Sequence, residues 1–135
     1  MDSSYDEKIL DALCFLYLTF SHATDGELTA DEMRTVANKI REWAPNASLE
    51  QIGAILKSTV GSYKALPDRV ERYRKAAACA GELKDNLSYD SLSRILSDMV
   101  AIAGADGVIA DEEREFLQAT AGTLGIPFGD IDSAS

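Results

Sequence analysis

The sequence has few of the residues on which disulfide scaffolds, zinc sites and histidine-based catalysis depend. Its 135 residues include two cysteines and one histidine. Cys14 and Cys79 form no CxxC pair and no Cys/His cluster is present, which excludes a zinc site of the usual spacing. Each cysteine lies in an apolar stretch. We therefore expect two buried free thiols in a reducing compartment, and a disulfide between them is the alternative.

Long apolar runs are also missing. No stretch reaches the roughly 20 apolar residues that a membrane-spanning helix needs. The first residues, MDSSYDEK, are polar and acidic, unlike a signal peptide. We therefore expect a cytoplasmic protein with no membrane insertion.

Basic residues are outnumbered, and the formal net charge is -10. Such a chain is repelled by phosphate backbones and anionic membranes, and it attracts cations or a basic partner. The one basic segment, 69–75, has four basic residues, and the acidic residues Asp68, Glu71, Glu82 and Asp85 are close by in the sequence. We interpret this segment as a solvated face and expect no nucleic-acid binding. The surplus carboxylates could also serve solubility alone.

Recognisable catalytic motifs are absent. The sequence contains no Walker loop, GxGxxG fingerprint, nucleophile elbow or metalloprotease helix. We therefore expect a protein that is not an enzyme. A metal-dependent hydrolase built on carboxylates is the lesser alternative, because it requires an open coordination position and a substrate cleft.

What the sequence does contain is the pattern of a helical domain. Hydrophobic residues make up 46% of the chain and proline occupies three positions. Apolar residues recurring at spacings of three and four predict an all-α, compact bundle. The predicted helices cover about 5–21, 30–43, 48–61, 67–81, 88–103 and 111–124. A short final turn carrying Ile126, Phe128 and Ile131 would make a seventh element. No strand pattern is present.

Capping residues support several of these boundaries. Ser48 with Gln51 has the form of a capping box, as does Thr29 with Glu32, in which each residue satisfies a free backbone N–H at the helix start. Ser88 is the expected cap of the fifth helix. Glycines are expected to end or weaken three helices, at Gly61, Gly81 and, as a C′ residue, Gly125.

The most informative feature is a repeated acidic string. Residues 25–32 read DGELTADE and residues 106–113 read DGVIADEE. Both copies share Asp-Gly-x-(Leu/Ile)-x-x-acid-Glu, and each lies between two amphipathic helices. The chain is therefore predicted to be one domain over 1–135. Its two helix-loop-helix halves, about 5–60 and 86–131, are expected to be related by a pseudo-twofold axis.

This spacing suits a site for a divalent cation. In one unbroken helix Asp25 and Glu32 would lie about 10 Å apart along the axis. Gly26 lets the backbone fold back, so that the aspartate can return toward the next helix. Two such loops meeting would bring together Asp25, Glu32, Asp106 and Glu113. Four carboxylates crowd together at neutral pH only with compensation. A hard cation such as Mg²⁺, Ca²⁺ or Mn²⁺ supplies it.

A simpler interpretation exists for the same residues. Asp-Gly is a common turn dipeptide, and Glu32 could complete a capping box with Thr29. The second copy favours the cation, because Ala110 cannot cap although Glu113 remains. His22 precedes the first loop and could touch a bound ion. A lone histidine near a helix end is more often a cap or a partly buried side chain.

The doubled string resembles the TerB-like (tellurite-resistance protein B) family. An apolar helix, Ala-x-Asp-Gly or Ala-Asp-Gly, an apolar residue and Asp/Glu-Glu opening another helix are given twice, over about 5–131. Residues 105–113 are the closer match, since the first copy has Thr24 before its aspartate. The resemblance implies about seven helices in pseudo-twofold halves around an acidic centre that holds a divalent metal. It places the family's acidic positions on Asp25, Glu32, Asp106 and Glu113.

The resemblance also implies a setting. Members of the family occur in stress and tellurite-resistance operons, or fused to modules such as the J-domains of co-chaperones. We therefore expect a non-catalytic, cation-binding helical domain with an unidentified protein partner. The alternative is a metal-free adaptor that presents its acidic face to a basic partner, or a groove to an amphipathic helix.

Overall fold

The computed structural model describes residues 7–22, 30–45, 47–66, 68–103 and 111–126. Over these ranges the chain is all-helical and contains no strand, which confirms the predicted fold class. The helices are α1 (Glu7–His22), α2 (Ala30–Trp43), α3 (Leu49–Ala65), α4 (Arg69–Asn86), α5 (Tyr89–Ala103) and α6 (Asp111–Leu124). None of the helices described is long and apolar enough to cross a membrane.

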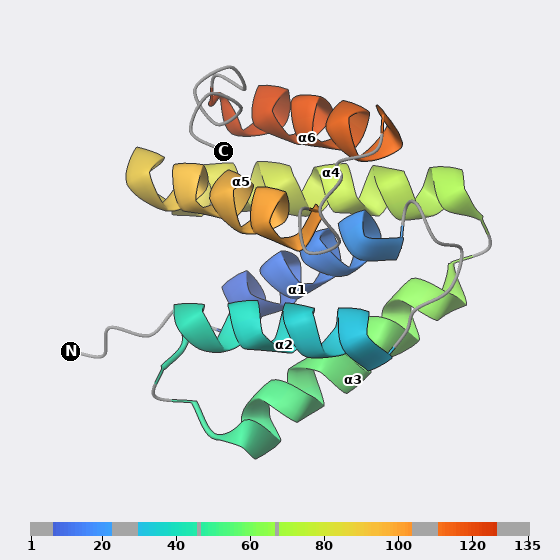
Figure 1. The fold of residues 1–135 in the computed structure, drawn as a ribbon, viewed down its shortest axis with the longest axis vertical. Helices are drawn as coiled ribbons and strands as arrows, with labels where there is room; N and C mark the ends of the chain where they lie inside the picture. The colour runs from blue at the N-terminus through green and yellow to red at the C-terminus, as the bar shows by residue number, and fades with distance from the viewer. Residues whose placement is uncertain (1–6, 23–29, 46, 67, 104–110, 127–135) are drawn as a thin grey trace.

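Helix α1 is the centre of the bundle (Figure 1). Every side chain from Ala12 to Phe20 is buried, because α2, α3, α4 and α5 all pack against this helix. Helix α6 packs on α4 and α5, on the side of them away from α3. The helix predicted over 5–21 is thus present and is buried on most sides. Because this helix is so enclosed, its few polar side chains must find partners inside the protein.

Three of the predicted caps are present. The Ser48 hydroxyl accepts from the Gln51 N–H at 3.1 Å, and the Gln51 side chain accepts from the Ser48 N–H at 2.8 Å, which completes the capping box. The Ser88 hydroxyl accepts a 3.3 Å bond from the backbone of Ser91. Gly125 follows α6 with φ of 75°. There the Ile126 N–H donates to the Ala121 carbonyl at 3.0 Å, the C-terminal motif that favours glycine.

The glycines inside α3 and α4 do not end their helices. Gly61 and Gly81 were expected to close or weaken them, but both helices continue past these positions. Beyond each glycine lies a buried side chain, Tyr63 at 3% exposure and Leu83 at 0%. Burying either side chain outweighs the roughly 1 kcal/mol that an internal glycine costs.

Some expected details of α3 and α4 are corrected at their starts. Leu49 and Val70, apolar residues of the predicted helices 48–61 and 67–81, are 68% and 62% exposed, because each lies in the first turn of its helix, at an end of the bundle. Helix α4 begins after an Asp68 cap, whose side chain accepts from the backbone of Glu71 at 2.9 Å. Pro67 and the final turn expected after Ile126 lie outside the described residues.

The structure contains two helix-loop-helix arms with nearly the same bounds. We name α1 with α2 arm 1, and α5 with α6 arm 2. Helix α1 ends at His22 and α5 at Ala103, while α2 covers 30–43 and α6 covers 111–124. Each of these bounds in arm 2 lies 81 residues after its counterpart, which is also the offset between the two acidic strings, whereas α5 begins 82 residues after α1.

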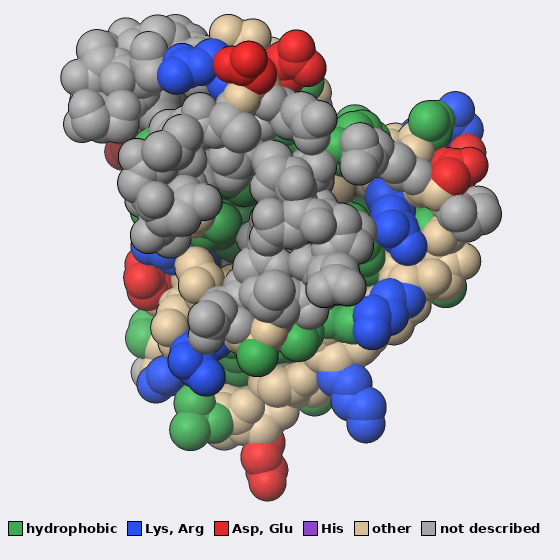
Figure 2. All heavy atoms as spheres, turned by 45° about the vertical axis from the view of Figure 1, so that its right-hand side comes forward, with side chains coloured by type: hydrophobic (Ala, Val, Ile, Leu, Met, Phe, Trp, Pro, Cys, Tyr) green, Lys and Arg blue, Asp and Glu red, His purple; other side chains and the backbone are tan. Residues whose placement is uncertain are grey.

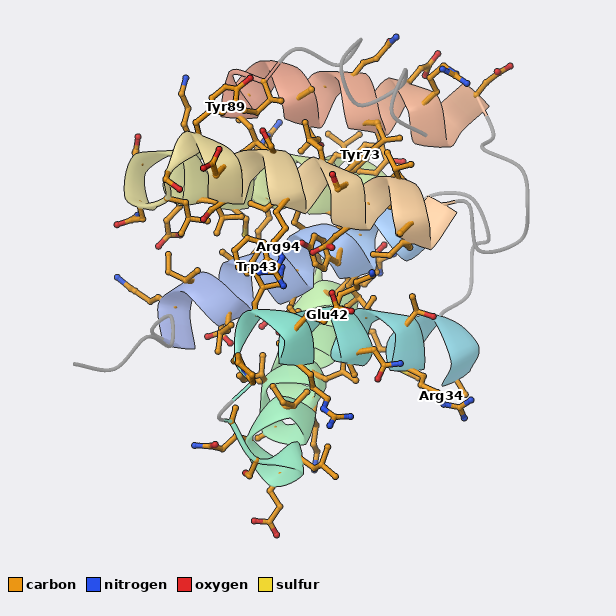
Figure 3. The ribbon with its side chains drawn as sticks, turned by 60° about the vertical axis from the view of Figure 1, so that its left-hand side comes forward. Arg34, Glu42, Trp43, Tyr73, Tyr89 and Arg94 are labelled. Carbon is orange, nitrogen blue, oxygen red and sulfur yellow. The ribbon has the colours of Figure 1, made fainter. Side chains whose placement is uncertain are left out.

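The two arms also point the same way. Helices α1 and α5 run in the same direction in both ribbon views, and α2 and α6 return against them (Figures 1 and 3). The last turns of α1 and α5 and the first turns of α2 and α6 therefore all lie at one end of the bundle, on the right in Figure 1. We call this the loop end.

Candidate functional site

Two of the predicted ligands sit at the loop end through their backbones. Glu32 and Glu113 are each the third residue of their helix, in the first turns of α2 and α6. Their side chains lie outside what the structure describes, as do Asp25 and Asp106 altogether and the side chain of His22. The meeting of these carboxylates therefore stays a prediction.

The surroundings of these positions suit negative charge. The first turn of a helix carries unpaired N–H groups and the positive end of the helix dipole, which favour a nearby carboxylate. Both acidic positions have this setting, in two arms that open toward the same end. Elsewhere among the described side chains, no group of three or more His, Cys, Asp or Glu is arranged to hold a metal ion.

A buried carboxylate joins the two arms behind the loop end. Asp98 of α5 is 6% exposed. Its Oδ2 accepts a 2.7 Å bond from the Tyr17 hydroxyl of α1 and a 2.8 Å bond from Trp43 Nε1 of α2. Burial and then the charge of Asp98 raise the pKa of Tyr17 well above its usual value, so the phenol keeps its proton and acts as the donor.

Cationic side chains surround this carboxylate. Lys39 Nζ lies 3.9 Å from Asp98 Oδ1. The Arg94 guanidinium lies over the Trp43 ring, 4.4 Å from its centroid, and is 4.0 Å from a Glu42 carboxylate oxygen. Figure 3 shows Arg94, Trp43 and Glu42 between α5 and α2. The negative charge of the buried aspartate is thus hydrogen-bonded and compensated, as a buried charge has to be.

The two residues at the centre of this contact occupy matching positions of the repeat. Tyr17 and Asp98 are 81 residues apart, which is the offset between the arms, and each stands five residues before the end of its helix. Sequence analysis missed this pair. The available signal was a lone carboxylate within the apolar face from Leu92 to Val100, in register with a buried tyrosine in the other copy.

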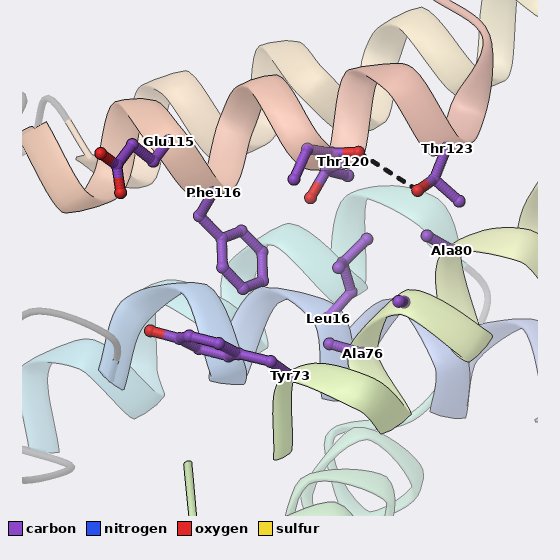
Figure 4. A pocket seen from close by; sticks show the side chains of 10 residues that line it. Leu16, Tyr73, Ala76, Ala80, Glu115, Phe116, Thr120 and Thr123 are labelled. Atoms are coloured by element: carbon purple, nitrogen blue, oxygen red, sulfur yellow. Dashed lines mark hydrogen bonds between the residues drawn. The ribbon is translucent and has the colours of Figure 1, made fainter. Parts of the chain in front are cut away.

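A second feature is a cavity of about 400 Å³ between α4 and α6, floored by Leu16 of α1. Tyr73 and Phe116 meet edge to face across it, with ring centroids 5.5 Å apart. Four alanines give it an apolar wall, and Glu115 and Thr123 stand at its two ends (Figure 4). Its size and lining are those of a site for an apolar group.

The described surface carries both signs of charge. On the face drawn in Figure 2, lysine or arginine side chains and aspartate or glutamate side chains both appear among the described residues. In the segment 69–75, which was predicted to be a solvated face, Arg74 is exposed and pairs with Glu71 at 3.1 Å. The exposed pair contributes little to stability.

Over the described residues the fold defines a class of protein, an all-helical domain built from two helix-loop-helix arms of nearly equal bounds, with the first helix of one arm buried at the centre. The sequence model of one family, described as tellurite resistance protein TerB, matches residues 11–135. The chain belongs to this TerB family. No curated protein and no solved structure matches the chain.

Proposed function

We propose that this TerB-family chain is a non-catalytic domain that binds one divalent cation between its two acidic loops. Asp25 and Glu32 from arm 1 and Asp106 and Glu113 from arm 2 would supply the ligands, related by a pseudo-twofold axis. The observation that carries the proposal is the common direction of the arms. The helix ends that flank the two loops match at an offset of 81 residues, and all four of them lie at one end of the bundle.

The donor set fits a hard cation. Four carboxylates offer oxygen ligands alone, which Ca²⁺, Mg²⁺ and Mn²⁺ prefer, whereas Zn²⁺ and Cu²⁺ favour nitrogen or sulfur. The positive ends of α2 and α6 lower the cost of holding Glu32 and Glu113 ionised before the cation arrives. A bound cation has the opposite charge to the carboxylates, so it would hold the two arms together at the loop end.

A calorimetric titration with Ca²⁺, Mg²⁺, Mn²⁺ and Zn²⁺ tests the proposal. We expect heat from at least one of the three hard cations with the natural chain, and loss of that heat in both Asp25→Asn and Asp106→Asn. Asp85→Asn, an exposed carboxylate in the last turn of α4, is the control for the change in net charge and should bind as the natural chain does.

Two results would contradict the proposal. Absence of heat with every cation would remove the site, and undiminished binding in either loop variant would show that the loops do not share one ion. The protein is then better described as a metal-free interaction module. The cavity between α4 and α6 favours that second function, since its apolar lining suits a side chain of an amphipathic partner helix.

The family's description suggests a role in tellurite resistance or stress, and we carry this to the chain as a proposal, together with a cytoplasmic location and a protein partner. Cation binding and partner binding are compatible. A cation that joins the arms would change the surface of the loop end. A partner that binds there would then sense whether the cation is bound.

A further inference from the structure

The interface behind the loop end combines an apolar surface with one directional contact. Helix α1 presents buried side chains on nearly all sides from residue 12 to residue 20. Apolar packing of this kind tolerates several alignments, because volume and pattern matter more than particular partners. The bonds from Tyr17 and Trp43 to Asp98 are different, since they form at one alignment of the helices only.

We propose that Asp98, with Tyr17 and Trp43, is a register lock that fixes arm 1 against arm 2 and thereby positions the two acidic loops. A buried polar group that specifies alignment at some cost in stability is a known use of such groups in helical proteins. Here the lock joins matching positions of the repeat, so it holds the two arms level with each other. Its service to the cation rests on the proposed function.

The required accuracy shows why a lock is needed. A slip of one helical turn moves one arm by about 5.4 Å along the other. Ligand oxygens must stand about 2.0–2.6 Å from a hard cation, so such a slip would remove one arm's carboxylates from the site. The lock lies five residues, or about 7.5 Å, before the ends of α1 and α5, close enough to control both loops.

The neighbours of Asp98 favour one alignment as well. Lys39 of arm 1 approaches the free oxygen of the carboxylate at 3.9 Å. Arg94 of arm 2 covers the Trp43 ring and reaches Glu42. A one-turn slip would separate these charges and leave a buried carboxylate without its donors, which is far more costly than losing apolar contact.

The distance between the arms tests the lock without any cation. Spin labels at Arg41→Cys and Gly122→Cys occupy matching exposed positions in α2 and α6, away from the loops. A side chain at Gly122 meets nothing within 4 Å, and Cys14 and Cys79 are buried from the label. The distance distribution between the labels is measured by pulsed electron resonance, and Ca²⁺ affinity is measured on the same chains.

The lock is weakened with Tyr17→Phe and removed with Tyr17→Phe/Asp98→Leu, which takes away the Tyr17 donor and the acceptor that it shares with Trp43. Thr19→Val is the matched control, because Thr19 is buried in the same helix but donates within it, to the Phe15 carbonyl at 2.8 Å. We expect one narrow distance in the natural chain and the control. In the double variant we expect a broadened distribution or a second population, because the arms are no longer held at one alignment.

Cation affinity separates this inference from the proposed function. We expect Ca²⁺ affinity to fall at least tenfold in the double variant while its helix content stays unchanged. Unchanged distances in both Tyr17→Phe and the double variant would overturn the lock. A shift in distance together with no Ca²⁺ binding by the natural chain would support the lock and reject the cation site.

Discussion

The two arms have nearly the same helix bounds but carry different side chains at corresponding positions. Three of the four helix bounds coincide at an offset of 81 residues, and several buried positions correspond, although α1 is buried over more of its surface than α5. Trp43 at the end of α2 corresponds to Leu124 at the end of α6, and both are 2% exposed. Tyr17 corresponds to Asp98. Arm 1 thus places hydrogen-bond donors where arm 2 places an aliphatic side chain and an acceptor.

This difference teaches that the repeat and the contact between its copies are specified separately. Apolar positions at equal spacing set the length and burial of the helices in both arms. Two apolar surfaces alone would allow several alignments of the arms. A hydrogen-bond donor in one arm and its acceptor in the other allow only one. Arm 1 reaches the centre of the bundle through α1, which packs on four helices, and arm 2 lies toward the outside.

The largest effect is expected from removing the acceptor. Asp98→Ala removes the acceptor of the buried Tyr17 hydroxyl and of the Trp43 N–H and opens space between the arms. We expect a loss of about 3–5 kcal/mol in the free energy of unfolding, measured by urea denaturation. Ser97→Ala, an exposed neighbour on α5, should change it by less than about 0.5 kcal/mol. A loss of under 1 kcal/mol in Asp98→Ala would mean that the polar contact is not what joins the arms.

Sequence patterns predicted the arms better than the contact between them. The ranges 30–43 and 111–124 match α2 and α6 to the residue, because periodicity and the C′ glycine are local signals. The helix ends predicted at Gly61 and Gly81 were wrong, because glycine alone does not decide where a helix ends. Whether a helix continues past a glycine depends on what its next residues bury, which is decided by distant parts of the chain.

The candidate site divides in the same way. The acidic strings and their flanking helices could be read locally, and so could the equivalence of the two copies. Asp98 could not be assigned a partner from sequence, since its donors lie 81 and 55 positions away. A carboxylate within an apolar face shows that a partner exists without showing which residue it is.

A second contrast between the arms concerns a buried thiol. Cys14 of arm 1 occupies the position that Ile95 holds in arm 2, and both are 0% exposed. Burial raises the pKa of Cys14 from 9.0 to about 12, while Cys79 in α4 rises from 9.0 to about 11. Above pH 9 the unfolded chain therefore releases thiol protons that the folded chain retains. Stability is full below pH 9 and falls as the pH rises toward the folded values.

Each thiol should lower the free energy of unfolding by about 1.4 kcal/mol per pH unit once the unfolded thiol is ionised. Urea denaturation at pH 7, 9, 10 and 10.5 measures this slope. In Cys14→Ala we expect lower stability at pH 7, from the lost packing, but a slope smaller by about that amount above pH 9. Equal slopes in the two chains would show that the Cys14 thiol does not stay protonated through burial.

The smallest effect compares the exposed faces of the two arms. Arg41 of α2, a good helix former, corresponds to Gly122 of α6, which is also exposed. A Cβ at Gly122 would meet no atom within 4 Å, and its φ is not positive. Gly122→Ala should therefore raise the free energy of unfolding by about 0.5–1 kcal/mol, through loss of backbone freedom in the unfolded chain.

Gly125→Ala is the informative contrast in thermal unfolding, because Gly125 has φ of 75° and alanine there should destabilise the protein. A gain in stability at both positions would mean that the C-terminal motif at Gly125 does not stabilise the end of α6.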